Sequence, residues 1–589
     1  MSASPLTYLT AAVELQENAD QWTVYESTGN CVILAGPGSG KTKTITVKIA
    51  RLLTEDVRWP QRIACITYSN ACVGELRTRL NRLGVEDGKR IAISTVHSFC
   101  LTELVLPFAG LAKLRVPDPL AVATPEQSRR FFAAAYEAVH GGRMNSAFRT
   151  ACDRLRRTIP DRNSVEWHSW TPRQTRVVEA YEDLLLANGL IDFDGLVLAG
   201  LELVERHSWI RQALRAKYPV VVIDEYQDLG LPLHRIILAL LGDGVRIIAV
   251  GDPDQSIYGF TGARPELLRT LAQDPRVSPV TLRLNYRCAD RIIAASRGLL
   301  PGSAAFRSHD GRVGEISFYK LKVGLQGQAQ YALETILPTL LTDNPHWQRG
   351  DIAFLYRSYK EGSAIAEIAD SLGLRYFRLD NGSPIKRTRL TEWLGLAARW
   401  CSGGWKTGEV QLSHVLKEWQ RLNRSRTSDT ARLVIRKQLI TALFSLRESS
   451  LPLHAWLEAL RDSALSTLLL EEPGLADEVD TFNELLAATA KDAALGNFTV
   501  QIFANQGKSQ DQINLMTLHS SKGLEFQAVL MLALEDGTFP NDYDKADAEQ
   551  LEEAGRLFYV GVTRAKEQAH MLYGWSESPF ITAIRAAVR

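Results

Sequence analysis

The sequence predicts an α/β fold with two core domains, each interrupted by a mainly helical insertion. An apolar run, a glycine-rich turn and an amphipathic helix follow one another at 31–53. Further apolar runs that end in polar or charged residues lie at 218–228, 246–263, 351–358 and 513–534. Such runs are typical of strands buried in parallel sheets. The chain has 589 residues, which at roughly 150 per domain leaves room for about four domains.

Composition narrows the class of protein. Hydrophobic residues make up 45% and charged residues 23%, which excludes a disordered chain, a collagen and a small disulfide scaffold. Lys plus Arg is 68 and Asp plus Glu is 67, so the net charge is 68 − 67 = +1. If the protein binds nucleic acid, its basic surface must therefore be confined to one region, and acidic residues elsewhere must offset that charge.

The sequence also predicts a cytoplasmic protein without a membrane span. No apolar run reaches the roughly 18 residues that a span needs, and the N-terminus lacks the basic and apolar regions of a signal peptide. The seven cysteines form no CxxC pair, which favours reduced thiols over a zinc site or a disulfide framework.

A phosphate-binding loop is the first chemical motif. The apolar run 31–34 predicts a strand, and the apolar spacing after Lys41 predicts a helix. Glycine backbone N–H groups in such a loop face phosphate oxygens, Lys41 reaches the β- and γ-phosphates, and Thr42 offers its hydroxyl to Mg²⁺. Ala35 replaces the first glycine of the strict pattern. The loop comprises Ala35, Gly36, Pro37, Gly38, Ser39, Gly40, Lys41 and Thr42.

Two further strand ends complete an ATPase site. Asp224 follows the apolar run 220–223 and is expected to hold Mg²⁺, while Glu225 is expected to accept a proton from the attacking water. Gln255 follows the next strand and can sense a γ-phosphate. Beyond it, Tyr258 and Phe260 are predicted to stack on bases; the alternative is that both rings pack in the core.

The second half of the chain supplies arginines but no second phosphate loop. Arg287 and Arg357 each follow a strand-like run, and Arg564 is expected at the start of a helix. A domain with arginines can stabilise the charge of a phosphate that is bound elsewhere. Between the cores, residues 101–190 and 385–509 read as helical insertions with charged faces.

In this order, the motifs resemble the UvrD/Rep/PcrA family of superfamily 1 DNA helicases. The resemblance implies two RecA-like P-loop cores with ATP and Mg²⁺ as cofactors. It implies that core 1 comprises 1–100 and 191–280 with insertion 101–190, and that core 2 comprises 281–384 and 510–589 with the reduced insertion 385–509. It also implies roles for single residues: adenine and ribose contacts at Gln21, Tyr286 and Glu525, arginine fingers at Arg287 and Arg564, and DNA contacts at Tyr68, Asn70, His97, Tyr258, Phe260, Arg357, Thr517 and His519.

The resemblance implies an ATP-dependent helicase or translocase that moves 3′ to 5′ on single-stranded DNA and at junctions with duplex, in repair, recombination or replication restart. Departures include Thr261 where the family has arginine, Leu229-Gly230 after the acidic motif, and EEAGR at 552–556. A fused nuclease is not expected, since only 589 − 564 = 25 residues follow Arg564.

Two alternatives stay open. The first is a DNA-stimulated ATPase that acts as motor or sensor subunit of a larger complex, for example with a nuclease in phage defence. The second is a P-loop enzyme of another class, such as a small-molecule kinase, and the arginine-bearing second core argues against it.

Overall fold

The computed structural model divides into two compact units. The first comprises Met1–Glu315, Pro540–Glu567 and Pro579–Arg589, and the second comprises Ile316–Phe539 and Gln568–Ser578. The described residues are 6–85, 88–142, 144–300, 306–380, 383, 385–386, 388–408, 410–422, 429–466, 469, 475, 478–491, 493, 495–505 and 511–588. No helix among them is both long and apolar enough to cross a membrane.

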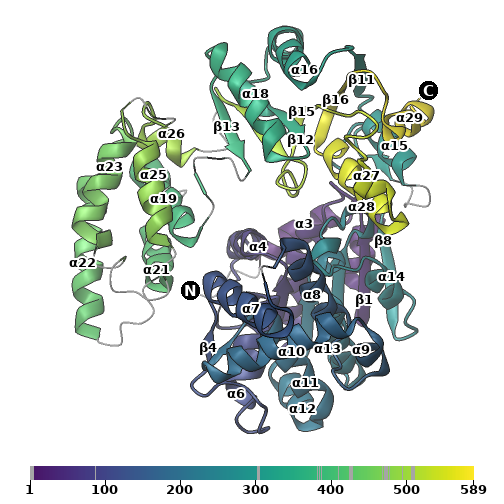
Figure 1. Ribbon diagram of the computed structural model, residues 1–589, viewed down its shortest axis with the longest axis vertical. Coiled ribbons are helices and arrows are strands. Elements are labelled where there is room, and N and C mark those ends of the chain that lie inside the picture. Colours follow the sequence, from purple (N-terminus) through teal and green to yellow (C-terminus); the bar gives the residue numbers. More distant parts are fainter. Residues whose placement is uncertain are drawn as a thin grey trace. The chain divides into compact units, whose positions relative to one another are not determined.

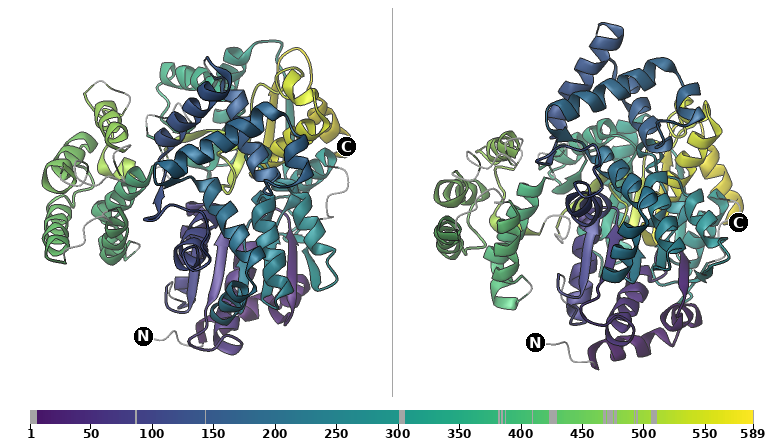
Figure 2. Two further views of the ribbon diagram at one scale, coloured as in Figure 1. Left: turned by 60° about the horizontal axis from the view of Figure 1, so that its bottom comes forward. Right: turned by 90° about the horizontal axis from the view of Figure 1, so that it is seen from below.

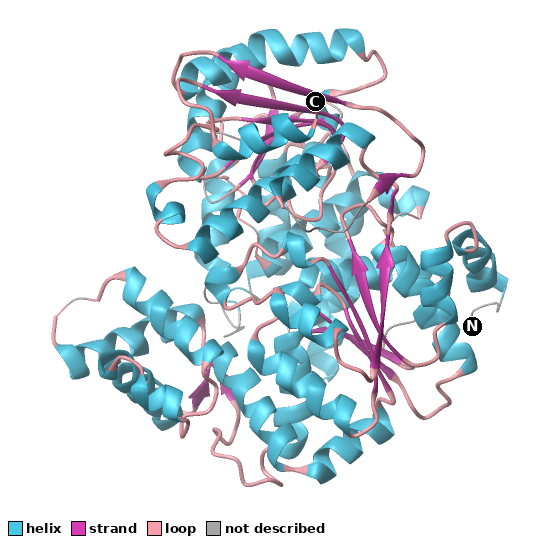
Figure 3. Ribbon diagram, turned by 90° about the vertical axis from the view of Figure 1, so that its right-hand side faces the viewer, coloured by secondary structure: helices cyan, strands magenta, loops and turns pink. Residues whose placement is uncertain are grey.

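A six-stranded sheet of parallel strands organises the first unit (Figures 1 and 3). Its order is β3-β2-β6-β7-β1-β8, so the strands that precede the predicted phosphate loop, acidic pair and Gln255 are neighbours. The strands are β1 (Asn30–Ala35), β2 (Ile63–Thr67), β3 (Ile91–Thr95), β6 (Val220–Ile223), β7 (Arg246–Gly251) and β8 (Val277–Leu282).

Side chains alternate between two apolar layers. Cys31 and Ile33 join a core with the helices that follow β1 and β2, whereas Val32 joins a second core on the other face. The central strands are buried on both faces, which explains their uninterrupted apolar sequence. The covering helices of this unit are α1 (Leu6–Leu15), α2 (Ala19–Glu26), α3 (Lys41–Glu55), α4 (Asn70–Arg82), α5 (Val96–Phe99), α6 (Leu106–Phe108), α11 (Phe193–Arg206), α12 (Ser208–Lys217), α13 (Leu231–Gly242), α14 (Glu266–Ala272), α15 (Asp290–Leu299), α27 (Asp542–Lys545), α28 (Ala548–Val562) and α29 (Pro579–Ala587).

The insertion between β3 and β6 is mainly helical, as predicted, and is blue in Figure 2. Its own core includes the buried rings of Phe132, Trp167 and Tyr181. A two-stranded parallel ribbon joins its ends, since β4 (Ala121–Val122) pairs with β5 (Leu190–Ile191). The helices are α7 (Pro125–His140), α8 (Ser146–Thr158), α9 (Val165–Ser169) and α10 (Pro172–Ala187).

The second unit is built on another six-stranded sheet, in the order β11-β16-β15-β12-β14-β13. Strand β12 is buried throughout and pairs in parallel with β14 and β15. The strands are β11 (Glu315–Lys320), β12 (Ile352–Tyr356), β13 (Tyr376–Leu379), β14 (Ile513–Thr517), β15 (Phe526–Met531) and β16 (Ala565–Tyr573), and the helices beside them are α16 (Leu325–Tyr331), α17 (Leu337–Asp343) and α18 (Tyr359–Ser371).

A separate helical bundle, light green in Figure 1, corresponds to the predicted second insertion. Its core is distinct from that of the sheet and contains Trp393, Trp400, Trp419 and Trp456. The helices are α19 (Arg389–Arg399), α20 (Trp405–Thr407), α21 (Leu412–Leu422), α22 (Asp429–Ser445), α23 (Leu453–Leu460), α25 (Glu478–Ala488) and α26 (Val500–Ala504).

The predicted α/β class with parallel sheets is confirmed, but one local expectation is wrong. Arg564 does not begin a helix: α28 ends at Val562, Thr563 caps it, and β16 begins at Ala565. The residues AKEQAHMLY form one long strand instead.

The compact units also differ from the predicted domains, because α15, α28 and α29 belong to the first unit. The assignment of these segments to a second core stays a prediction.

Candidate functional site

The phosphate loop joins β1 to α3 in the first unit. Gly38 and Gly40 have φ of 69° and 79°, which is left-handed backbone that favours glycine. Lys41 is the first residue of α3, so the helix N-terminus with its unpaired N–H groups faces the loop. The Ser39 hydroxyl donates to Gly36 O at 2.8 Å and closes the turn.

Neighbouring side chains occupy the space that a Cβ atom would need at each loop glycine. At Gly36 such an atom would lie 2.5 Å from the Phe306 ring, and at Gly38 it would lie 2.5 Å from Arg287 Cβ. At Gly40 it would lie 2.5 Å from Gln21 Nε2. Two of these residues, Arg287 and Gln21, were predicted to contact the nucleotide, whereas Phe306 was not.

The site concentrates buried charges at the carboxyl ends of β6 and β7. Lys41 Nζ lies 3.8 Å from Glu225 Oε1. Burial alone lowers the pKa of Lys41, but Glu225, Asp252 and Asp224 outweigh it and the pKa is raised. Burial, then the adjacent Glu225, raise the pKa of Asp224 to about 7. Burial and Asp254 raise the pKa of Asp252 to about 6.

The backbone turns sharply after Asp224. Glu225 has a φ of 52°, which a residue with a side chain rarely adopts, and its N–H donates to Asp224 Oδ1 at 3.0 Å. Gln227 donates to the Glu225 carboxylate and accepts the N–H of Asp252 at 3.0 Å. Gln255 Nε2 in turn donates to Asp252 Oδ2 at 2.5 Å. One chain of hydrogen bonds thus links the predicted base to the predicted γ-phosphate sensor.

Both predicted arginine fingers belong to the first unit. Arg287 packs its Cβ on Gly38, and its N–H donates to Asn285 Oδ1 at 2.8 Å. Arg564 is 1% exposed and donates to Val560 O at 3.0 Å. Burial, and next the charge of Arg287, lower the pKa of Arg564 to about 9. The positive charge of Arg287 also tends to lower the pKa of Lys41. Arg287, Arg564 and Lys41 therefore belong to one electrostatic cluster.

The predicted adenine residues lie at the other end of the loop. Gln21 is buried and donates from Nε2 to Ser39 O at 3.0 Å. The Tyr286 ring is 40% exposed and its hydroxyl accepts from Asn18 Nδ2 at 3.0 Å. Asn18 also caps α2, the helix that carries Gln21. Asn18 was not predicted as a site residue, although an Asn three residues before Gln21 suits the N-cap position of a helix.

An aromatic row extends from the loop after Gln255. Tyr68 and Tyr258 stack with centroids 5.2 Å apart, and Phe260 meets Tyr258 edge-on at 6.1 Å. Phe260 is 54% exposed, so the interpretation that it packs in the core is wrong. His97 contacts the Phe193 ring, which is 52% exposed and was also missed. Asn70, the first residue of α4, is exposed as well.

Four predicted site residues lie in the second unit. Thr517 ends β14 and accepts the N–H of Ser520 at 3.1 Å, and His519 follows in the same turn. Glu525 is exposed just before β15. Arg357 follows β12, stacks over Phe539 at 5.0 Å and donates to Thr538 O at 3.3 Å. Their roles toward nucleotide or DNA stay predictions.

The first unit offers the groups that a nucleoside triphosphate with Mg²⁺ requires. Neighbouring side chains fill the space beside the loop glycines, and Lys41 supplies a cation whose side chain is 12% exposed. Thr42 lies in the first turn of α3, and the Asp224 carboxylate lies at the end of β6. Hydroxyl and carboxylate oxygens suit Mg²⁺, which usually takes few protein ligands beside phosphate and water.

Comparison with known proteins agrees with this geometry. Residues 17–276 match the UvrD/REP helicase N-terminal domain, and residues 456–574 match the UvrD-like helicase C-terminal domain. ATP-dependent DNA helicase Rep of Escherichia coli is 27% identical over 92% of this chain and 88% of its own. DNA helicase II of the same species is 26% identical over 92% and 82%. ATP-dependent DNA helicase UvrD2 of Mycobacterium tuberculosis is 26% identical over 94% and 77%.

Glu225→Gln is expected to keep nucleotide binding and to lose turnover. The amide preserves the size of the side chain but cannot take a proton from water, which costs roughly 10²–10⁴ in rate. Binding of a fluorescent ATP analogue and release of phosphate measure the two effects separately. Glu266→Gln, at a side chain 57% exposed, is the matched control. Loss of nucleotide binding would show that Glu225 maintains the loop rather than acting as the base.

Arg287→Ala and Arg564→Ala are each expected to lower the rate of ATP hydrolysis by roughly 10³–10⁵, as for arginine fingers in phosphoryl transfer. Arg276→Ala removes an exposed arginine paired with Asp274 and serves as control. Melting temperatures of all three variants separate a catalytic defect from unfolding, which matters for the buried Arg564. If both variants retained rates within a few-fold of the parent, neither guanidinium would act on the transferred phosphate.

Proposed function

Because the chain belongs to the UvrD/Rep helicase family, we propose that it moves 3′ to 5′ along single-stranded DNA and couples this movement to ATP hydrolysis. As a member of that family it is an ATP-dependent DNA helicase. The direction and a role in repair, recombination or replication restart rest on the resemblance. Single strands and their junctions with duplex are the proposed substrates.

One observation supports the proposal most directly. Gln255, which is hydrogen-bonded to Asp252 beside the phosphate loop, lies three residues before Tyr258 and five before the exposed Phe260. A single short segment therefore contacts the nucleotide site at one end and carries stacking rings at the other. Aromatic rings hold single strands by stacking on bases, largely without regard to sequence.

The residues of the first unit support a definite division of labour in hydrolysis. Lys41 compensates the β- and γ-phosphate charge, and Glu225 takes the proton of the attacking water. Arg287 and Arg564 stabilise the charge that develops on the transferred group. Thr42 and Asp224 would hold Mg²⁺, which when bound neutralises phosphate charge. Gln21 and Tyr286 bind the adenine end.

The remaining assignments extend this proposal. Residues 281–384 and 510–589 would form the second core, in which Glu525 contacts the ribose and His519, Thr517 and Arg357 contact DNA. Phe193 joins the proposed DNA contacts because its exposed ring lies beside His97. All seven cysteines are free and six are buried, which supports a reducing, cytoplasmic location.

A second candidate is a DNA-stimulated ATPase that serves a larger complex, such as one with a nuclease or repair factor, and unwinds little alone. It is favoured by Thr261, which replaces the arginine that the family carries beside Phe260. The loop is instead reached by an arginine of the insertion, since Arg157 Nη1 donates to Thr261 O at 2.9 Å.

The test is ATP hydrolysis by the purified chain with and without single-stranded DNA, followed by unwinding of a 3′-tailed duplex. Hydrolysis is expected to rise with DNA, and the stimulation should weaken as salt rises because bound phosphates release counterions. Lys41→Ala is the inactive control. Stimulation with unwinding of only the 3′-tailed substrate supports the helicase, and stimulation without unwinding supports the second candidate. Equal rates with and without DNA would contradict both.

Phe260→Ala is expected to weaken binding of single-stranded DNA by roughly 1–3 kcal/mol, the contribution of one stacked base. Because the ring is 54% exposed, the melting temperature should change little. Fluorescence anisotropy with a labelled oligothymidine and calorimetry measure the two quantities. Trp59→Ala, which removes a ring that is 71% exposed before β2, is the matched control. A large drop in melting temperature with intact DNA binding would contradict the stacking role.

A further inference from the structure

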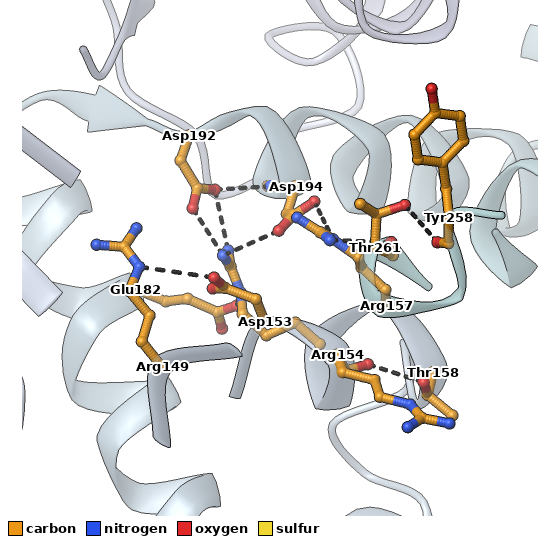
Figure 4. A network of polar contacts seen from close by, with 12 residues as sticks. Arg149, Asp153, Arg154, Arg157, Thr158, Glu182, Asp192, Asp194, Tyr258 and Thr261 are labelled. Carbon is orange, nitrogen blue, oxygen red and sulfur yellow. Dashed lines mark hydrogen bonds and ion pairs between the residues drawn. The ribbon is translucent and has the colours of Figure 1, made fainter. Parts of the chain in front are cut away.

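The segment between Gln255 and Gly262 is held from two sides by helices that lie far apart in sequence. One is α8 of the first insertion, and the other is α28, which ends just before Arg564. Both helices and the segment belong to the first unit. Figure 4 shows how Arg157 of α8 reaches the segment at Thr261.

The contacts from α28 meet the backbone of the segment at two points. Glu553 Oε1 accepts the N–H of Gly259 at 2.9 Å, and Arg556 Nε donates to Ser256 O at 2.8 Å. The Arg556 side chain is only 12% exposed, and Glu553 is half-buried, so water competes weakly for either bond. Backbone contacts of this kind fix the path of the chain whatever side chains it carries.

The contact from α8 meets the segment beyond the rings. Arg157 donates from Nη1 to Thr261 O at 2.9 Å and from Nε to Asp194 Oδ1 at 2.8 Å. Asp194 lies in the first turn of α11, so the guanidinium is anchored to the covering helices of the first sheet. The Thr261 hydroxyl donates to Tyr258 O at 2.8 Å. The position of Thr261 therefore also restricts the backbone at Tyr258.

Side chains of the two helices lie close against Gly259 and Gly262 of the segment. A Cβ atom at Gly259 would lie 2.4 Å from Glu553 Oε2, and one at Gly262 would lie 3.1 Å from Arg157 Cβ. Gly262 also has a φ of 87°, whereas Gly259 has no left-handed backbone. At Gly259, therefore, an added methyl group would have to displace the Glu553 carboxylate from its position at the segment backbone.

The contacting residues of α28 lie on one stripe of the helix that leads to the nucleotide site. Glu549, Glu553, Arg556 and Tyr559 are spaced by four, three and three residues, so they share one face. Glu549 binds Arg154 of α8 at 3.0 Å, and buried Tyr559 interacts with the charges of Asp252 and Arg564. The stripe thus runs from the first insertion, past the aromatic segment, to the second predicted finger.

We infer that Glu553, Arg556 and Arg157 form a clamp that couples the rings of Tyr258 and Phe260 to the nucleotide site. They are positioning residues: they touch neither the reacting atoms nor the bases, but fix the segment that joins Gln255 to the rings. A shift of α28 with the state of the nucleotide moves the segment backbone at Ser256 and Gly259. This inference rests on the proposed function, since it concerns the same ATP and DNA sites.

The test measures the coupling between the two sites rather than either affinity. The dissociation constant for a labelled oligothymidine is determined with ADP and with a non-hydrolysable ATP analogue. The ratio of the two constants is the coupling factor, typically about 5–150 between linked sites. Glu553→Ala, Arg556→Ala and Arg157→Ala should each bring this factor toward one. Glu553→Gln should retain it, because the amide oxygen still accepts the N–H of Gly259.

Glu266→Ala is the control, since it removes the same charge from a side chain of α14 that is 57% exposed and pairs with Arg264 rather than with a clamp residue. It should leave the factor unchanged. Gly259→Ala adds the colliding methyl group and should reduce the factor as Glu553→Ala does. In the Glu553→Ala background the same methyl group meets no carboxylate, so the double variant should match Glu553→Ala alone. This non-additivity is a property of residues in direct contact.

The outcomes separate the two levels of proposal. If the parent protein shows no difference between nucleotide states and no stimulation by DNA, the proposed function fails and the clamp with it. If the parent is coupled and the clamp variants are equally coupled, only the clamp is overturned. Weaker affinities in both nucleotide states with an unchanged factor would mean that these contacts only stabilise the fold. A reduced factor with an unchanged melting temperature supports the clamp.

Discussion

The close approach of side chains to the phosphate loop is the constraint on which the rest of the site depends. Gly38 and Gly40 adopt left-handed backbone, and Arg287 and Gln21 fill the space where their side chains would be. The loop thereby lies against the two side chains that are proposed to contact opposite ends of a nucleotide. Because the sheet is parallel, the same edge also receives the carboxylates that follow β6 and β7.

This arrangement concentrates charge where water is scarce. Lys41, Arg287 and Arg564 face Asp224, Glu225 and Asp252 in one cluster, and burial raises the pKa of both aspartates while it lowers the pKa of Arg564. A charge added close to such buried groups shifts their pKa values further. A phosphate bound at the proposed site would therefore change the electrostatics around Asp252 and Gln255, at the start of the segment.

The elements that depend on local sequence patterns could be predicted from the sequence alone. Buried strands such as 220–223 and the loop 35–42 have patterns that few other structures share, and their bounds were predicted closely. Arg564 was placed wrongly because the residues after it suit a helix or a strand, and sheet pairing decided for β16. Glu553, Arg556 and Arg157 could not be found in advance, because their partners are backbone atoms roughly 100 to 300 positions away in the chain, and no local pattern marks such a contact.

The clamp and the departures from the family pattern have a common physical explanation. Where relatives carry an arginine beside the exposed ring, this chain has Thr261, whose carbonyl accepts from Arg157 and whose hydroxyl closes on Tyr258. A guanidinium is thus present at the segment, but it comes from α8 and is tied to Asp194 rather than being displayed toward solvent. The Arg157 guanidinium holds the protein backbone at Thr261, and under the proposed function the rings of Tyr258 and Phe260 would contact the single strand at this position. Stacking of this kind would need few exposed cations along the strand, which is compatible with the chain's net charge of +1.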